Sequence, residues 1–274
     1  MSSRTAFVLG GGGLLGAVEV GMLQALFERD VQPDLVLGTS VGALNGLVVA
    51  ADPTPAAVDR LLDLWSSVGE SNEVYSDRTW RQVQRAVRTG THIHSAKPLR
   101  ERLDQEFGDL TFDQLAVPFQ CCAASIERAA EHWFTHGPVV PAVVASAAVP
   151  GLLPPARVEG EHYLDGGIVN SIPVGRAVEL GADRIFVLQV GRVDRPLKAP
   201  RKPWEVARVS FEIARRHRFV REMAELPEGV VAHVLPAAGS ARDDSPRAYR
   251  DTSQVAPRIR AAYDASRAYL DEHL

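Results

Sequence analysis

The stretch that decides the fold lies near the start of the chain and contains two glycine turns, Gly10-Gly11-Gly12-Gly13-Leu14-Leu15-Gly16 and Gly38-Thr39-Ser40-Val41-Gly42. A short apolar run precedes each turn, and each turn opens a helical pattern. The β-type runs are residues 5–9 and 34–37, and the helical patterns are residues 14–28 and 41–50. The same unit of strand, turn and helix therefore occurs twice, which predicts an α/β fold.

The second turn has the Gly-x-Ser-x-Gly spacing of a nucleophile elbow, in which a serine is pushed clear of the backbone at a strand-to-helix turn. Gly38 and Gly42 allow the sharp turn and the close approach of the helix, whose N-terminus stabilises developing negative charge. The spacing therefore predicts Ser40 as a nucleophile. The alternative is that Ser40 only caps the helix.

The first turn fits two kinds of site. It matches the Gly-x-Gly-x-x-Gly pattern of a dinucleotide site, and Asp34 follows about 20 residues later. In that interpretation the helix N-terminus binds a pyrophosphate, whereas in a hydrolase the same N–H groups bind the oxyanion of a tetrahedral intermediate. The neighbouring Ser40 turn favours the hydrolase.

The remaining pattern predicts a central sheet covered by helices. Residues 184–190 form an apolar run bounded by glycines, which is typical of a strand buried on both faces. Residues 53–108 are helical in pattern and predict an insertion or cap. The other expected strands are 119–126, 132–135 and 230–235, and the other expected helices are 139–147, 174–180, 204–226 and one ending near Leu270.

Composition indicates a globular chain without a strong charge preference. The 274 residues are 46% hydrophobic and 23% charged, with a formal net charge of −4, which gives no sequence-wide attraction to nucleic acid or anionic lipid. The length suits one domain. Cys121 and Cys122 are adjacent, so we expect buried thiols and no disulfide framework. Because we find no signal-peptide core and no apolar stretch of roughly 20 residues, we expect a cytoplasmic protein.

A nucleophilic serine needs a base, and the sequence offers two kinds. Eight histidines follow Ser40, and none stands in a distinctive setting. Asp165-Gly166-Gly167 instead follows a short β-type run, where a glycine pair lets a carboxylate approach another backbone turn. Taken alone, Asp-Gly is also a common hairpin turn.

Together the motifs resemble the patatin-like phospholipases, a family with a modified α/β-hydrolase architecture and a Ser–Asp dyad without histidine. Ordered motifs across about residues 5–190 are far more specific than any one of them. They are Gly11-Gly12-Gly13-Leu14-Leu15-Gly16, Gly21-Met22-Leu23-Gln24-Ala25-Leu26, Gly38-Thr39-Ser40-Val41-Gly42-Ala43-Leu44-Asn45, Ser146-Ala147-Ala148-Val149-Pro150, Leu153-Pro154-Pro155, Tyr163-Leu164-Asp165-Gly166-Gly167-Ile168-Val169-Asn170-Ser171-Ile172-Pro173 and Gly181-Ala182-Asp183.

The resemblance implies a three-layer α/β/α fold with a mainly parallel central sheet, built by residues 1–274 as a single domain with a C-terminal extension from about residue 200. It implies Ser40 as the nucleophile and Asp165 as the base. The implied oxyanion hole is formed by backbone N–H groups of Gly11, Gly12, Gly13 and Val41. The glycines implied to support the motifs are Gly16, Gly38, Gly42, Gly166 and Gly167.

One position departs from the pattern of the family. Many members carry a basic residue just before the last glycine of the first motif, where this chain has Leu15. The backbone N–H groups of the turn are unaffected by this change. Any contact that a positive charge would make near the site is put in doubt.

The implied function is a serine-dependent lipid acyl hydrolase of phospholipase A or lysophospholipase type, whose partner is a lipid or other acyl-ester substrate. A general carboxylesterase, an acyltransferase and a catalytically silent lipid-binding or regulatory protein remain as alternatives. We expect no cofactor, no metal site and no nucleic-acid partner, and we expect catalysis to be independent of calcium.

A basic segment bears on association with membranes. Residues 201–225 contain seven Lys or Arg against four acids, with apolar residues interleaved. This pattern is compatible with transient docking on an anionic membrane surface. The alternative, a solvated helix with one face packed on the core, fits the negative net charge better.

Overall fold

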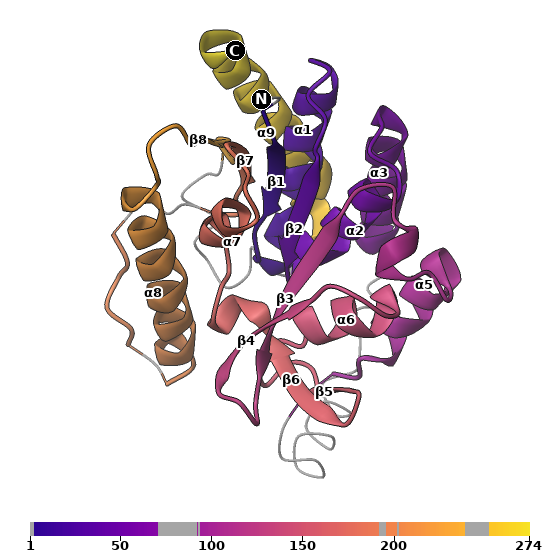
Figure 1. The fold of residues 1–274 in the computed structure, drawn as a ribbon. Helices are drawn as coiled ribbons and strands as arrows, with labels where there is room; N and C mark the ends of the chain where they lie inside the picture. The colour runs from indigo at the N-terminus through magenta and orange to yellow at the C-terminus, as the bar shows by residue number, and fades with distance from the viewer. Residues whose placement is uncertain (1–2, 71–91, 93, 192–195, 202, 239–251) are drawn as a thin grey trace.

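The computed structural model describes residues 3–70, 92, 94–191, 196–201, 203–238 and 252–274. Within these residues eight strands form one sheet, in the order β5-β6-β3-β2-β1-β7-β8 with β4 also paired to β3 (Figure 1). The strands are β1 (Thr5–Leu9), β2 (Leu35–Thr39), β3 (Phe119–Ser125), β4 (Ala130–Phe134), β5 (Ala156–Val158), β6 (Glu161–Asp165), β7 (Arg184–Leu188) and β8 (Val231–Val234).

The centre of the sheet is parallel. β1 pairs in parallel with both β2 and β7, β2 with β3, and β7 with β8. β4, β6 and β5 form the antiparallel part next to β3. Leu9 is in register with both Gly38 and Leu188, so the two glycine turns leave the same edge of the sheet side by side. The expected mainly parallel sheet is confirmed.

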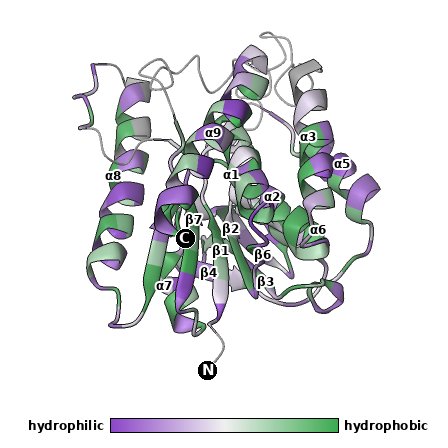
Figure 2. Ribbon diagram, turned by 90° about the horizontal axis from the view of Figure 1, so that it is seen from above, coloured by the Kyte–Doolittle hydropathy of each residue, from purple (hydrophilic) through white to green (hydrophobic). Residues whose placement is uncertain are grey.

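Helices cover both faces of the sheet. The helices are α1 (Ala17–Phe27), α2 (Val41–Ala51), α3 (Pro55–Glu70), α5 (Lys97–Phe107), α6 (Val139–Ser146), α7 (Val174–Glu179), α8 (Pro203–Ala224) and α9 (Val255–His273), with short 3-10 turns η1 (Gly13–Gly16), η2 (Phe112–Gln114), η3 (Gly166–Ile168) and η6 (Thr252–Gln254). α7 and α8 cover one face, and the other helices lie over the opposite face (Figure 2).

Alternation along β1 explains these layers. Phe7 and Leu9 are buried with the helices of the larger layer, whereas Ala6 and Val8 are buried with α7 and α8. Successive side chains of a strand point to opposite faces, so a strand that is apolar throughout requires cover on both. The three-layer α/β/α arrangement follows from this pattern.

Most expected elements are present, with shifts at their ends. The predicted helix over 14–28 begins with the 3-10 turn η1, because Leu15 N–H donates to the Gly12 carbonyl. The helical region over 53–108 contains α3 and α5, and residues 71–91 and 93 of it lie outside the described residues. The expected strands 119–126 and 132–135 correspond to β3 and β4, which pair with each other antiparallel.

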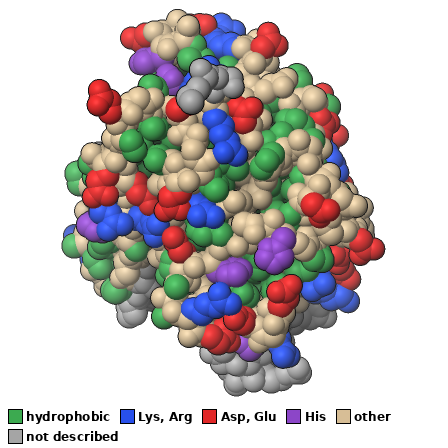
Figure 3. Space-filling view, viewed as in Figure 1, with side chains coloured by type: hydrophobic (Ala, Val, Ile, Leu, Met, Phe, Trp, Pro, Cys, Tyr) green, Lys and Arg blue, Asp and Glu red, His purple; other side chains and the backbone are tan. Residues whose placement is uncertain are grey.

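Charges of both signs share the surface. On the face shown in Figure 3, basic and acidic side chains are interspersed, without a patch of one sign. In the part of the chain that the structure describes, no helix is both long and apolar enough to cross a bilayer. Cys121 and Cys122 are free and buried, as expected.

α9 packs closely along α1 through a glycine. A Cβ on Gly21 would lie 2.1 Å from the Ile259 carbonyl oxygen and 2.7 Å from the Tyr263 nitrogen. Nearby, the Tyr263 hydroxyl donates to Glu28 at 2.8 Å. The absence of a side chain at Gly21 therefore lets the two helix backbones approach.

We predict that Gly21→Ala lowers the free energy of unfolding by about 1–3 kcal/mol, because the added methyl group would collide with backbone atoms of α9. The better helix propensity of alanine, about 1 kcal/mol, offsets only part of this cost. Gly46→Ala in α2 is the control, since its Cβ would meet only side-chain atoms of Phe119 and Val36 at 3.2 Å. Urea unfolding measures both, and an unchanged midpoint for Gly21→Ala would contradict the prediction.

Candidate active site

Ser40 lies at the turn between β2 and α2. Its backbone has φ 57° and ψ −122°, a strained conformation for a residue with a side chain and one that suits a nucleophile elbow. Ser146 at the end of α6 holds this turn: its Oγ accepts from Ser40 N at 2.9 Å and donates to the Cys122 carbonyl at 2.6 Å. The Ser40 side chain is thereby directed toward the loop that follows β6.

Glycines bring the N-terminus of α2 against the first turn. A Cβ on Gly42 would lie 2.3 Å from the Leu9 carbonyl oxygen, and a Cβ on Gly38 would lie 2.5 Å from the Gly42 carbonyl oxygen. A Cβ on Gly16 would overlap the Val41 side chain. The spacing of these glycines therefore reflects close packing between the two turns.

Asp165 ends β6 and contacts Ser40 directly. The Ser40 hydroxyl donates to Asp165 Oδ2 at 2.5 Å, and the Gly167 N–H donates to Oδ1 at 2.7 Å. A Cβ on Gly166 would lie 2.2 Å from the Cys122 carbonyl oxygen, so the loop approaches β3 closely. Both carboxylate oxygens have a donor, which fixes the orientation of the group.

Burial dominates the electrostatics of this carboxyl. Asp165 is 1% exposed, and burial raises its pKa from 3.8 to about 6. The hydrogen bonds from Ser40 and Gly167 lower the pKa and offset only part of the effect of burial. The group is therefore ionised at neutral pH and is a stronger base than an ordinary aspartate.

The first glycine turn supplies backbone N–H groups beside Ser40. The Gly11 N–H donates to the Ser171 carbonyl at 3.0 Å, so this expected oxyanion donor is committed to the fold. Within the described ranges, no acceptor bonds to the N–H groups of Gly12, Gly13 or Val41. Gly13 and Val41 also line the cavity next to Ser40. Of the four expected donors, Gly12, Gly13 and Val41 therefore have an N–H group without an acceptor in the described structure.

The structure removes Asp34 from the dinucleotide interpretation of the first turn. Asp34 precedes β2, where its carboxylate accepts from the Thr5 N–H at 2.8 Å. It therefore lies at the opposite end of the strands from the glycine turn. A ribose whose pyrophosphate occupied that turn would be out of its reach.

Sequence reasoning misses a buried polar chain under the first turn. Asn45 Nδ2 donates to Glu19 at 2.7 Å and to the Gly16 carbonyl at 3.1 Å, and Asn45 Oδ1 accepts from Trp65 Nε1 at 3.1 Å. Burial raises the pKa of Glu19 well above its usual range, and the hydrogen bond from Asn45 offsets part of this shift. The available signal is a single acidic residue in a helix whose other residues, apart from Gln24 and Gly21, are apolar.

An apolar cavity of about 170 Å³ lies next to Ser40. Its walls come from α2, α3, α5 and the segment after α6. The apolar lining residues include Leu44, Val48, Leu61, Leu64, Trp65, Leu99, Leu103, Phe107, Val149 and Leu153, and Ser95, Arg102 and Glu106 add polar groups. A concave apolar site with a few polar groups is suited to a ligand with a hydrocarbon part.

We next consider the histidines and candidate metal ligands among the described residues. In the described part of the chain, which includes all eight histidines, no histidine ring bonds to Ser40 or Asp165. Among the same residues, no group of three or more His, Cys, Asp or Glu is arranged to hold a metal ion. The contact of Ser40 with a carboxylate is therefore direct.

The chain is similar in sequence to known proteins. Lysophospholipase nte1 of Aspergillus terreus is 32% identical over 188 residues, covering 68% of this chain and 12% of that protein. A putative patatin-like phospholipase domain-containing protein of Caenorhabditis elegans, M110.7, is 31% identical over 191 residues, covering 68% of this chain and 17% of its own length. The chain thus matches less than a fifth of the length of these curated relatives.

A solved structure and a family model match the chain as well. The structure of VipD from Legionella pneumophila aligns with a TM-score of 0.50 and 15% identity, covering 100% of this chain and 67% of that one, a likeness that shows the fold alone. A family model described as patatin-like phospholipase matches residues 7–178, which include both glycine turns, Ser40 and Asp165. The chain therefore belongs to the patatin-like phospholipase family.

Proposed function

We propose that this chain is a serine-dependent lipid acyl hydrolase of phospholipase A or lysophospholipase type. The observation that carries the proposal is the 2.5 Å hydrogen bond from Ser40 Oγ to Asp165 Oδ2 beside an apolar cavity. It joins a hydroxyl to a base of raised pKa next to space for a hydrocarbon chain. The lysophospholipase relative from Aspergillus terreus supports the substrate class.

In the first half of the reaction, Ser40 Oγ attacks the ester carbonyl carbon while its proton passes to Asp165. The carbonyl oxygen becomes an oxyanion, which accepts hydrogen bonds from the N–H groups of Gly12, Gly13 and Val41. When the intermediate collapses, the C–O bond to the alcohol breaks and the alcohol takes the proton from Asp165. An acyl group remains on Ser40.

In the second half, Asp165 takes a proton from water, whose oxygen attacks the acyl carbonyl. Collapse of this second intermediate returns the proton to Ser40 Oγ and releases the fatty acid. The same carboxylate serves both halves because it lies within hydrogen-bond reach of the serine oxygen. An alcohol in place of water would give acyl transfer by the same steps.

We predict that the wild-type protein reacts with a fluorophosphonate probe and hydrolyses a long-chain lysophospholipid. Ser40→Ala should do neither, and Asp165→Asn should lose turnover by about 100-fold or more, because the general base is absent. Ser66→Ala, an exposed serine of α3, is the control. Gel labelling and fatty-acid release measure the two activities.

Each other outcome points to one alternative. Labelling without lipid turnover would keep Ser40 as the nucleophile and move the substrate to other esters. Transfer of the acyl group to an added alcohol in preference to water would favour an acyltransferase. A folded wild-type protein that does not label would favour a lipid-binding protein.

The raised pKa of Asp165 predicts the pH profile of turnover. The carboxylate must be ionised to accept the proton from Ser40, so kcat should rise with pH through about 6 and level off above it. Replacing each of the eight histidines by Gln in turn should leave this rise in place. If one such variant abolished both activity and the pH dependence while remaining folded, the assignment of Asp165 as the base would be wrong.

The cavity predicts a preference for long-chain over short-chain esters. A larger side chain in the lining of the cavity should remove this preference. Leu99 of α5 lines the cavity, so Leu99→Trp should lower kcat/KM for long-chain esters relative to short-chain esters by about tenfold or more. Leu115→Trp is the control, since Leu115 is partly buried outside the cavity. If Leu99→Trp left the ratio of kcat/KM for long-chain and short-chain esters unchanged, the acyl chain would not occupy this cavity.

Docking of α8 on an anionic membrane remains a prediction from the sequence. In the structure, Arg215, Arg216 and Arg218 form ion pairs with carboxylates of the protein itself. Phe219 of the same helix is buried against the sheet. These contacts favour the alternative of a helix that packs one face on the core.

A further inference from the structure

α8 directs two arginines into the body of the protein. It lies beyond residues 7–178, the part matched by the family. The side chain of Arg215 is 3% exposed and that of Arg218 is 29% exposed. They are three positions apart and therefore share one face of the helix with the buried Phe219 nearby.

Arg215 joins two segments that hold the first glycine turn. Its Nε donates to Ser171 Oγ at 3.2 Å, and an Nη donates to the Val190 carbonyl. The Ser171 carbonyl accepts the Gly11 N–H at 3.0 Å, and the Val190 side chain lies 2.3 Å from where a Cβ on Gly12 would be. The Arg215 guanidinium therefore contacts both segments, at Ser171 and at Val190, that pack against the first glycine turn.

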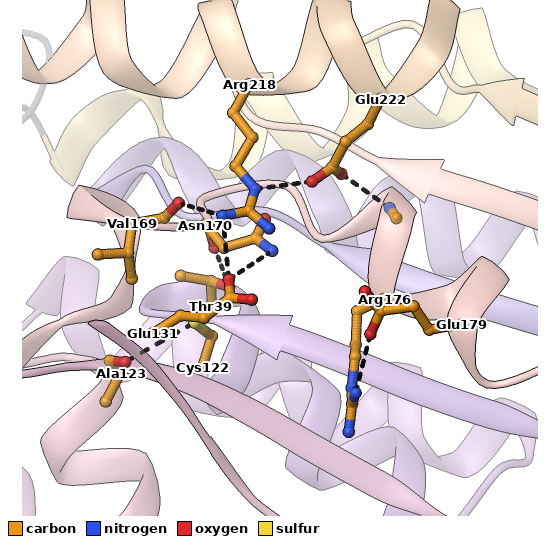
Figure 4. Close-up of polar contacts among 11 residues, drawn as sticks. Thr39, Cys122, Ala123, Glu131, Val169, Asn170, Arg176, Glu179, Arg218 and Glu222 are labelled. Carbon is orange, nitrogen blue, oxygen red and sulfur yellow. Dashed lines mark hydrogen bonds and ion pairs between the residues drawn. The ribbon is translucent and has the colours of Figure 1, made fainter. Parts of the chain in front are cut away.

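Arg218 holds the loop that follows Asp165 (Figure 4). Its Nη1 donates to the Val169 carbonyl at 3.1 Å and pairs with Glu131 Oε2 at 3.0 Å. The same Glu131 oxygen accepts from Asn170 Nδ2 at 3.2 Å. The Asn170 carbonyl in turn accepts from Thr39 Oγ1 at 2.8 Å, directly before Ser40. Arg218 is thus linked to both ends of the Ser–Asp contact.

The arginine is itself held in place from the helix. Glu222, one turn further along α8, accepts from Arg218 Nε at 2.7 Å through one oxygen and from the Gly175 N–H at 2.7 Å through the other. Residues 169–175 are therefore attached to α8 at both ends. Arg215 and Arg218 also provide hydrogen-bond donors for the backbone carbonyls of Val190 and Val169.

We propose that α8 is a brace for the active site, in which Arg215 and Arg218 are positioning residues for the Asp165 loop and the first glycine turn. This inference rests on the proposed function of Ser40 and Asp165. The two arginines fix residues 169–171, and through them the geometry between the nucleophile, the base and the N–H donors. Neither arginine touches the substrate.

Because the cavity lies away from α8, loss of the two arginines should affect kcat rather than KM. The cavity is lined from α2, α3 and α5, and none of the described side chains of α8 lines it. Figures 1 and 2 show α8 and α5 on opposite sides of the molecule. Loss of the brace should therefore lower kcat and leave KM nearly unchanged. An arginine donates in several fixed directions, whereas a lysine is a single point donor, so lysine should restore only part of the function.

The test compares Arg215→Met, Arg218→Met, Arg215→Lys and Arg218→Lys with Arg221→Met, which removes an exposed arginine from the same helix. We expect kcat for lysophospholipid and the rate of fluorophosphonate labelling to fall by about tenfold or more in both Met variants. KM should stay within about twofold of wild type, and the Lys variants should be intermediate. Arg221→Met should match wild type.

The outcomes separate the brace from the chemistry. If folded Met variants keep wild-type kcat and labelling rates, or if KM rises as much as kcat falls, the brace is overturned while the proposed function stands. If the wild-type protein neither labels nor hydrolyses esters, the proposed function fails first. Should a Met variant not fold, the Lys variant of the same position decides, because it keeps charge and length: wild-type kcat would then overturn the brace, and a reduced kcat with unchanged KM would support it.

Discussion

The buried hydrogen bond between Ser40 and Asp165 joins two residues 125 positions apart, and the rest of the structure is arranged around it. β3 brings the two residues together, because it pairs in parallel with β2, which precedes Ser40, and antiparallel with β6, which ends at Asp165. Thr39, the residue before the serine, is in register with Cys122, and Asp165 is in register with the next residue, Ala123. A slip of one residue in either pairing would turn these side chains to the wrong face.

Burying Asp165 and straining the backbone of Ser40 are costly for the folded protein. The pKa of Asp165 is about 6 in the folded chain against 3.8 ordinarily, so its contribution favours folding at low pH and is lost as the pH rises through 6. At neutral pH the ionised carboxylate costs about 3 kcal/mol. The backbone of Ser40 adds strain of about 1–3 kcal/mol. Domains are stable by only about 5–15 kcal/mol, so extensive packing on both faces of the sheet must offset this cost.

Local sequence reasoning succeeds where the physical cause is local. The glycine turns, the apolar strands and the Ser40 elbow follow from spacing along a few residues, and the structure contains them. Asp165 is weaker evidence alone, since Asp-Gly also suits a hairpin, and only the ordered motifs connect it to Ser40. The commitment of the Gly11 N–H to Ser171 could not be predicted, because it depends on a loop 160 positions away in the chain.

Contacts between a side chain and the backbone of a distant segment are the hardest to predict from a sequence motif. Leu15 is buried in the core, and the Ser171 and Val190 segments that support the turn are contacted by a positive charge from α8, Arg215. Arg215 and Arg218 bind the carbonyls of Val190 and Val169, and any residue at these positions offers the same oxygen. These two contacts place no demand on the side chains of Val169 and Val190, whereas Ser171 and Asn170 also take part through their side chains. The motif can therefore be complete while the helix that supports it lies outside the matched region.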